Sequence, residues 1–149
     1  ANRFLPRGDI VWREDPIGNR YQQVKAIMTD ALTQGVAGFD GERAVALDVV
    51  VTKFHALTEK ARYTVGGVHA IQFHLTIRDA VSGEMLSTRH IKADFDGLGG
   101  KAARAAEARG ITQKVRINQH ISHVIQQELG QPGGYAERDT GFIGAINQI

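Results

Sequence analysis

The chain contains no cysteine and only 3 prolines among its 149 residues. The lack of cysteine excludes disulfides, thiol catalysis, iron–sulfur clusters and zinc sites built from cysteine. No apolar run approaches the roughly 18 residues that a membrane-spanning helix needs. Aromatic residues are scarce at 7%, whereas 42% of the residues are hydrophobic and 23% are charged. These proportions are typical of a globular protein and exclude a wholly disordered chain.

The excess of positive charge is small. The 18 Lys and Arg residues against 16 Asp and Glu leave a net charge of +2, which creates no general field for nucleic acid. We therefore expect no nucleic-acid partner, and any anion-binding surface must come from local clustering of basic side chains. Residues 1–8 begin without Met and lack the apolar core of a signal peptide. We interpret them as the remnant of a tether, left after trimming.

Hydrophobic patterning predicts one domain over residues 9–130, followed by a Gly-rich tail over 131–149. Period-two alternation and short apolar stretches with β-branched residues predict strands. These strands are expected over residues 9–13, 45–54, 68–78 and 85–95. Apolar side chains at every third or fourth position predict two helices, over 19–35 and 101–129, and Gly110 allows a bend in the second helix.

The order β-α-β-β-β-α predicts a two-layer α+β sandwich. Strands joined by short links should form an antiparallel sheet of three to four strands, and two amphipathic helices can cover only one of its faces. Charged residues in the segment 85–95 are typical of a sheet margin. The other face would be left to water or a partner, and its polar positions are Asp48, Thr52, Gln72, His74 and Thr76.

Two patterns superficially suggest bound phosphate or metal. Residues 97–102, Gly-Leu-Gly-Gly-Lys-Ala, match a phosphate-binding loop, but the chain ends in the helix that follows, without the later strand of a parallel βαβ unit. Among the 6 histidines, His120 and His123 are spaced i, i+3, whereas His69 and His74 should point to opposite faces of a strand. Because no HExxH motif accompanies them, we predict no metal site and no cofactor.

Two further motifs are weak. Asp139-Thr140-Gly141 spells an aspartic-protease triplet, but charged residues precede it in place of an apolar strand. Ser122-His123 lacks the glycine-flanked elbow of a serine hydrolase.

The tail is expected to be loosely attached or to dock on a partner, since its only anchors are Phe142, Ile143, Ile146 and Ile149.

A basic stripe is the candidate binding feature of the last predicted helix. Arg109, Arg116, His120 and His123 fall within about 60° of one another at 100° per residue. Glutamines 113, 119 and 127 lie beside them, without an acid in the sector. Such a stripe could bind an anionic glycan, a lipid headgroup or an acidic protein. The alternative is an ordinary solvated helix face, since exposed arginines are common.

Four stretches resemble a family of small Gram-negative envelope lipoproteins of unknown function. They are residues 51–58 (VTKFHALT), 62–69 (RYTVGGVH), 75–84 (LTIRDAVSGE) and 93–100 (ADFDGLGG), and the likeness spans about 9–130. The resemblance implies a periplasmic domain anchored by a lipid, with a signal peptide and an acylated cysteine ahead of Ala1. It implies no catalytic residue, and the element order is similar to that of periplasmic lipoprotein adaptor domains.

These observations predict a non-catalytic binding or adaptor module. Its partner would be another envelope protein or a glycan, contacted through the uncovered sheet face or through the loop over 57–67, and its membrane contact would come only from the lipid anchor. The alternative is an enzyme or small-ligand carrier with a pocket between sheet and helices, into which His55, His69 or His74 would project. A filled core would favour the first hypothesis and a pocket of several hundred Å³ the second.

Overall fold

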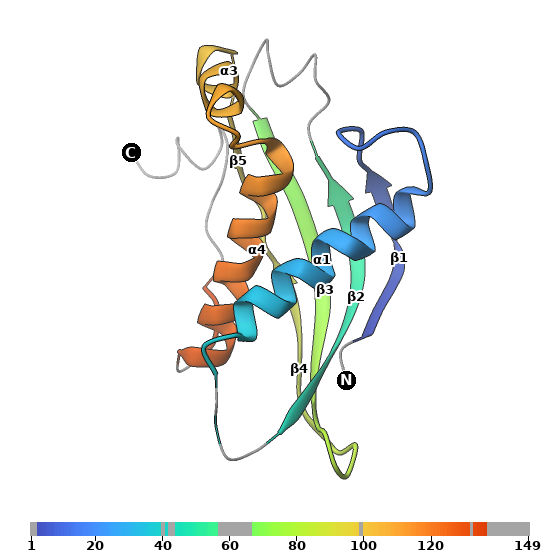
Figure 1. Cartoon of the computed structure of the whole chain (residues 1–149). Helices are drawn as coiled ribbons and strands as arrows, with labels where there is room; N and C mark the ends of the chain where they lie inside the picture. The colour runs from blue at the N-terminus through green and yellow to red at the C-terminus, as the bar shows by residue number, and fades with distance from the viewer. Residues whose placement is uncertain are drawn as a thin grey trace.

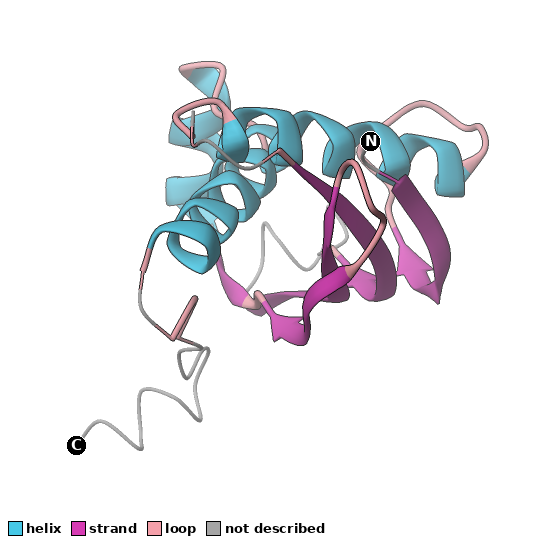
Figure 2. Ribbon diagram, turned by 90° about the horizontal axis from the view of Figure 1, so that it is seen from below, coloured by secondary structure: helices cyan, strands magenta, loops and turns pink. Residues whose placement is uncertain are grey.

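The computed structural model describes residues 3–39, 41, 44–56, 67–98, 100–131 and 133–136. Its elements follow in the order β1 (Arg3–Val11), α1 (Arg20–Val36), β2 (Val45–His55), β3 (Gly67–Asp79), β4 (Met85–Lys92), β5 (Phe95–Gly97), α3 (Gly100–Ala108) and α4 (Gln113–Gly130). Figure 1 shows α1 and α4 crossing the same face of the sheet. Seen from below in Figure 2, the helices form one layer and the strands the other. The predicted α+β fold with two layers is confirmed.

The sheet is larger and more mixed than the sequence predicted. Its order is β1-β2-β3-β4, with β5 pairing to β3. The β2–β3 and β3–β4 pairs are antiparallel as expected, but β1 runs parallel to β2. A parallel pair needs a crossover, which α1 supplies while covering the sheet. The strand predicted over 9–13 begins earlier, at Arg3. The residues before position 9 lack the alternating pattern that marks a strand. Pro6 is tolerated in β1 because β1 lies at an edge of the sheet.

The strand predicted over 85–95 is split in two by a buried carboxylate. The backbone N–H of Ala93 still donates to the carbonyl of Ile71 at 2.8 Å. The backbone N–H of Ile71 donates instead to Oδ1 of Asp94 at 2.9 Å, and Asp94 is only 9% exposed. Its carboxylate takes the place of a strand carbonyl, which satisfies a buried donor while β4 ends. Pairing with β3 resumes in β5, where Phe95 lies opposite His69.

The helix predicted over 101–129 is two helices. Gly110 has a φ of +78°, and its N–H donates to the carbonyl of Glu107 at 2.9 Å while that of Ile111 donates to Ala106 at 2.8 Å. This is a Schellman motif, which ends α3 at the only residue type that adopts such a φ without strain. Thr112 then caps α4, its side chain accepting from the N–H of Val115 at 3.2 Å. The expected bend at Gly110 is confirmed as a complete break.

The space between the two layers is filled with apolar side chains. Residues with no exposed surface come from both helices and from the central strands: Val24, Met28, Val49, Val51, Phe54, Ile71, Phe73, Ile117, Ile121, Val124 and Ile125. Such side chains have no water-sized space beside them. The helices also approach closely, because a Cβ built on Gly35 of α1 would lie 2.8 Å from Ile125 of α4.

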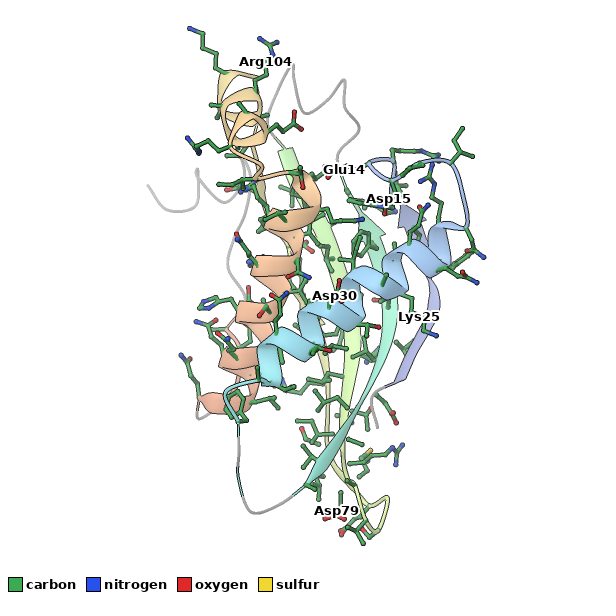
Figure 3. All side chains as sticks on the ribbon, in the orientation of Figure 1. Glu14, Asp15, Lys25, Asp30, Asp79 and Arg104 are labelled. Carbon is green, nitrogen blue, oxygen red and sulfur yellow. The ribbon has the colours of Figure 1, made fainter. Side chains whose placement is uncertain are left out.

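The loop after β1 fastens the beginning of α4. Trp12 is fully buried, and its Nε1 donates to Oδ2 of Asp15 at 2.7 Å. Oδ1 of the same carboxylate lies 2.6 Å from Nζ of Lys114, and the N–H of Lys114 donates to Oε1 of Glu14 at 3.1 Å. Glu14 thus adds negative charge at the helix N-terminus, where it is favourable. Figure 3 labels Glu14 and Asp15 in this region.

Candidate functional site

The face of the sheet turned away from α1 and α4 carries polar side chains, and we call it the open face. Its described members are Asp48, Val50, Thr52 and Lys53 of β2, Gln72, His74, Thr76 and Arg78 of β3, and Thr88, His90 and Lys92 of β4. All are partly or fully exposed, whereas the residues alternating with them on β2 and β3 are mostly buried. The five positions that the sequence assigned to this face lie on it as expected.

The turn between β3 and β4 sets the register of this face. Oδ1 of Asp79 accepts from the N–H groups of Val81 at 2.9 Å and Ser82 at 2.8 Å, and Gly83 has a φ of +77°. Figure 3 labels Asp79 at this end of the sheet. The resulting register places His74 opposite His90. Two histidines 16 positions apart in the chain thereby become neighbours.

His74 and His90 occupy the kind of strand position where side chains come closest. Because the N–H of Ala93 donates to Ile71, the alternation of an antiparallel ladder makes His74 and His90 a non-hydrogen-bonded pair. Their ring centroids are 4.8 Å apart, with an angle of 61° between the planes. Oγ1 of Thr52 lies 3.2 Å from Nε2 of His90 and donates to the carbonyl of Gln72 at 3.1 Å. Three strands thus contribute to one polar cluster.

Positive charge predominates among the described side chains of the open face. Lys53 and Lys92 lie on either side of Gln72 in the register. Nε of Arg78 lies 3.0 Å from Oδ2 of Asp48, and the buried carboxylate of Asp94 accepts from Nε2 of Gln72 at 3.4 Å. The open face therefore carries more cations than carboxylates, in a chain whose overall net charge is only +2. This local clustering attracts anionic groups.

The predicted basic stripe is distributed over two segments. Arg116, His120 and His123 share α4, whereas Arg109 lies in the turn between α3 and α4. The break at Gly110 separates Arg109 from the helical periodicity that grouped the four residues. Arg109 and His123 are exposed, and the other two are partly buried. Anion binding by these residues stays a prediction.

Arg116 and His120 pack on β5 through the ring of Phe95. The His120 ring stacks on it with centroids 4.4 Å apart, and Cζ of Arg116 lies 5.4 Å from its centre. Nη2 of Arg116 also donates to the carbonyl of Asp96 at 3.2 Å. Burial lowers the pKa of Arg116 below its usual value, but a guanidinium stays charged at neutral pH. Half of the predicted stripe therefore also stabilises the contact between α4 and β5.

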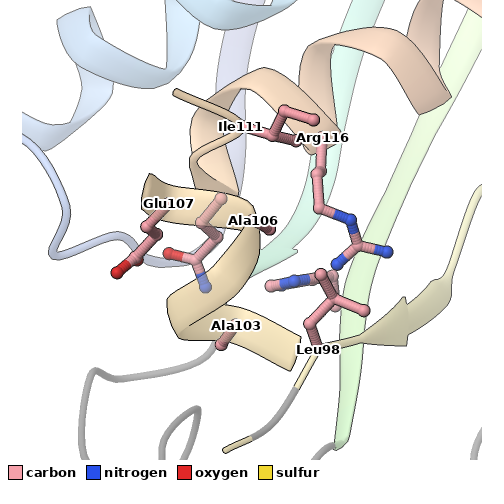
Figure 4. A pocket seen from close by; sticks show the side chains of 8 residues that line it. Leu98, Ala103, Ala106, Glu107, Ile111 and Arg116 are labelled. Atoms are coloured by element: carbon pink, nitrogen blue, oxygen red, sulfur yellow. The ribbon is translucent and has the colours of Figure 1, made fainter. Parts of the chain in front are cut away.

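A small cavity lies under α3, and Figure 4 shows the residues that line it. It has a volume of about 10 Å³ and is bordered by His69, Ala103, Ala106, Gln113 and Arg116, with Leu98, Glu107 and Ile111. His69 and Gln113 are almost fully buried. The volume suffices for about one water molecule, which is too small for an organic substrate.

The histidines named for an interlayer pocket do not converge. His69 is buried on the helix side of β3, whereas His74 is exposed on the open face. Their predicted opposite orientation is confirmed. His55, at the end of β2, lies opposite Ala70 in the register. Of the three, His69 is the one that lines the small cavity under α3.

A surface groove runs along the junction of α1 and α4. Its volume is about 380 Å³, and its lining is rich in amides and carries both charge signs. The lining residues are Ala26, Ile27, Asp30, Gln34, Lys114, Val115, Asn118 and Gln119. The groove lies on the helical layer and not between the layers.

The remaining sequence motifs gain no support from their surroundings. The strand before the Gly97–Ala102 turn, β5, is antiparallel to β3, so this turn does not belong to a parallel βαβ unit. In the described ranges, no group of three or more His, Cys, Asp or Glu side chains could hold a metal ion. The same part of the chain contains no helix long and apolar enough to cross a membrane. The Asp139–Gly141 triplet and residues 57–66 of the predicted loop lie outside the described residues.

The beginning of the predicted tail is packed against the domain. Tyr135 is only 4% exposed, and its N–H donates to Oε2 of Glu128 at 3.0 Å. Nη1 of Arg89 on β4 lies 2.6 Å from the same oxygen. Residues 133–136 are therefore anchored by Tyr135, which is not among the four apolar residues expected to anchor the tail. The residues from 137 onward lie outside the described part.

Comparison with known proteins gives a family but no activity. No curated protein matches the sequence. Among solved structures, the chain is similar to a candidate lipoprotein from Caulobacter crescentus CB15, with 16% identity and a TM-score of 0.42, over 70% of this chain and 78% of that one. The model of a family of unknown function, DUF6778, matches residues 1–145. Because this match covers nearly the whole sequence, the chain belongs to the DUF6778 family.

Proposed function

We propose that the chain is a non-catalytic binding module of the bacterial cell envelope that holds an acidic partner protein on its open face. The observation that carries this proposal is a polar sheet face that neither α1 nor α4 covers and on which cations outnumber carboxylates. Lys53 and Lys92 supply positive charge near the two histidines, whereas the charge of Arg78 is balanced by its ion pair with Asp48. Complementary charge speeds association and selects the partner.

The tight packing between sheet and helices supports a binding module over an enzyme. Sites for small organic molecules are typically clefts of several hundred Å³ with a few convergent polar groups. Here the facing side chains of sheet and helices are fully buried, and the small cavity under α3 has a volume of only about 10 Å³. The proposal therefore favours the binding module over the enzyme or ligand carrier with an interlayer pocket.

The envelope location rests on the resemblance over residues 9–130 to small envelope lipoproteins. It is tested by producing the natural full-length protein in its host with an alkyne-labelled fatty acid. We expect fluorescent labelling after click chemistry, together with recovery in the membrane fraction. Replacing the acylated cysteine of the precursor should abolish both. An unlabelled protein recovered with cytosolic markers would overturn the location.

The docking surface is tested by placing a photo-crosslinking amino acid at single exposed positions of the full-length protein in cells. Thr88 reports on the open face, and Gln126, exposed on α4, is the matched control on the helical layer. We expect a discrete protein adduct from position 88 and none from position 126. The double substitution Lys53→Glu and Lys92→Glu should weaken the adduct at position 88 by reversing the local charge.

Three results would contradict the docking surface. Adducts from position 126 alone would place the contact on the helices. A glycan adduct at position 88 would replace the protein partner with a polysaccharide. An adduct that persists unchanged in the charge-reversed variant, at low and at physiological salt, would remove the electrostatic basis of the proposal.

A further inference from the structure

We infer that His74 and His90 form a binding site for a divalent ion of the late first transition row. Among these ions, Cu²⁺ is expected to bind most tightly. This inference does not need the acidic partner, because the two imidazoles belong to one chain. They come from adjacent strands and face each other at a non-hydrogen-bonded position. Both side chains are exposed, so an ion reaches them directly from solvent.

The distance between the two rings matches that of two imidazoles on one ion. Imidazole nitrogens bind such ions at about 2.0–2.1 Å, and the ring centroid lies roughly 1.1 Å behind the nitrogen. For nitrogen–metal–nitrogen angles of about 90–109°, the centroids are then about 4.5–5.2 Å apart. The observed separation of His74 and His90 is 4.8 Å. The backbone register therefore already holds the rings at the spacing of a chelate.

The hydroxyl of Thr52 favours the neutral tautomer of His90 in which Nδ1 can bind a metal ion. A hydroxyl has one proton, and that of Thr52 goes to the carbonyl of Gln72 at 3.1 Å. At 3.2 Å from Nε2 of His90, the same oxygen is left to accept a hydrogen bond. His90 therefore carries its proton on Nε2 when neutral, and the lone pair of Nδ1 is available to an ion. Metal-binding histidines commonly donate their other N–H in this way.

The surroundings of the pair select the kind of ion. Calcium and magnesium need several oxygen ligands, mostly carboxylates. Asp48 of the open face forms an ion pair with Arg78. The positive charges of Lys53 and Lys92 repel a cation that is held by charge alone. An ion that gains affinity from imidazole donors is favoured instead, in the order Cu²⁺ above Ni²⁺ and Zn²⁺. Water completes its coordination in the isolated chain.

The test is a titration of the purified chain with Cu²⁺, Ni²⁺ or Zn²⁺ alone, each in a non-coordinating buffer. Affinity is measured by calorimetry, and the ligands are identified from the imidazole signals in NMR spectra. We expect the signals of His74 and His90 to change first and together. His74→Ala and His90→Ala should each lower the affinity at least tenfold, and the double variant should bind hardly more weakly than either, because one substitution already destroys the chelate.

Three further variants separate ligation from structure. Thr52→Val keeps the branched shape and both histidines but removes the acceptor for His90, and it should weaken binding by about tenfold. His123→Ala removes an exposed histidine of α4 and should leave the affinity unchanged. His74→Gln serves as a polar replacement if a smaller side chain perturbs the sheet.

The inference is overturned if wild type and His74→Ala bind equally, or if the first signals to change belong to other histidines. A variant whose circular dichroism and melting temperature equal those of wild type but whose affinity drops supports it. Failure of this titration leaves the photo-crosslinking result at position 88 unaffected, so the metal site and the docking surface are judged separately.

Discussion

Asp15 connects two segments that are about a hundred positions apart in the chain. Its carboxylate accepts from buried Trp12 and contacts Lys114 at the start of α4. Burial by itself raises the pKa of Asp15, but the hydrogen bonds from Lys114 and Trp12 together with the nearby positive charges prevail and lower it. The ionised form is therefore favoured by folding, which ties the stability of this junction to pH.

Asp15→Asn should lower the free energy of unfolding by about 1 kcal/mol at pH 7, because a charge-assisted contact is lost from a partly exposed site. Since the native pKa lies below the usual value of about 3.9, the stabilisation is complete above that pH. It is lost as the pH falls through the native pKa, so the two proteins should converge in acid. Urea unfolding from pH 7 to pH 3 measures this. Asp30→Asn, on an exposed side chain of α1, is the control and should change little.

The sequence predicted the face on which His74 lies, but it did not predict that His74 contacts His90. Alternation placed His74 on the open face, because that depends only on neighbouring residues. Its partner depends on register, which is set by the Asp79 turn and by an irregularity between Ile77 and Arg78. The intervening pattern is blurred, with Leu86 exposed. Pairing histidines across the turn therefore needed the structure.

At the scale of elements, α1, β2 and β3 were predicted within about two residues because their hydrophobic periods are long and undisturbed. β1 and β5 were missed in part, since each is stabilised by pairing and not by its own pattern. β5 depends on Asp94, whose role as a substitute acceptor for Ile71 appears only in three dimensions. The break in the last predicted helix is a local effect, and Gly110 already signalled it.

Gly110→Ala distinguishes that break from a continuous helix. Alanine is the better helix former by about 1 kcal/mol, so a continuous helix would be stabilised. The observed φ of +78° costs an L-residue about 1–2 kcal/mol, and no atom lies within 4 Å of the added Cβ. We expect the free energy of unfolding to fall by about 1 kcal/mol in urea titrations. An increase would show that α3 and α4 are joined.

The crossing of α1 and α4 depends on a glycine at their closest approach. A Cβ on Gly35 would lie 2.8 Å from two carbons of Ile125 and 3.0 Å from the carbonyl of Ser122. Gly35→Ala should therefore lower the free energy of unfolding by about 1–3 kcal/mol through overpacking, despite its better helix propensity. Gly38→Ala is the control, because its Cβ meets nothing within 4 Å. Equal thermal stability of Gly35→Ala and wild type would contradict this close approach.

At the scale of the whole molecule, α1 and α4 cover one face of the sheet, and neither of them covers the other face. The β-α-β unit and the later helix α4 place both covering helices on one side (Figures 1 and 2). Strands with one covered face alternate in polarity, and this explains why the sequence predicted the open face correctly. The connections between the elements determine which face α1 and α4 leave uncovered, and the register determines which charged side chains lie together on that face.

Because the interior is filled with side chains, we expect no ligand site inside the protein. Wild type should not bind benzene, and its melting temperature should not change when benzene is added. Phe73 is fully buried at the centre of β3, so Phe73→Ala should lower the free energy of unfolding by about 3–5 kcal/mol. If the variant remains folded, its new cavity should bind benzene, since apolar cavities stay dry and accept such ligands. Thr76→Ala, on the open face of the same strand, is the control and should create no such site. Saturable binding of benzene to native wild type would instead support a ligand carrier with an internal pocket.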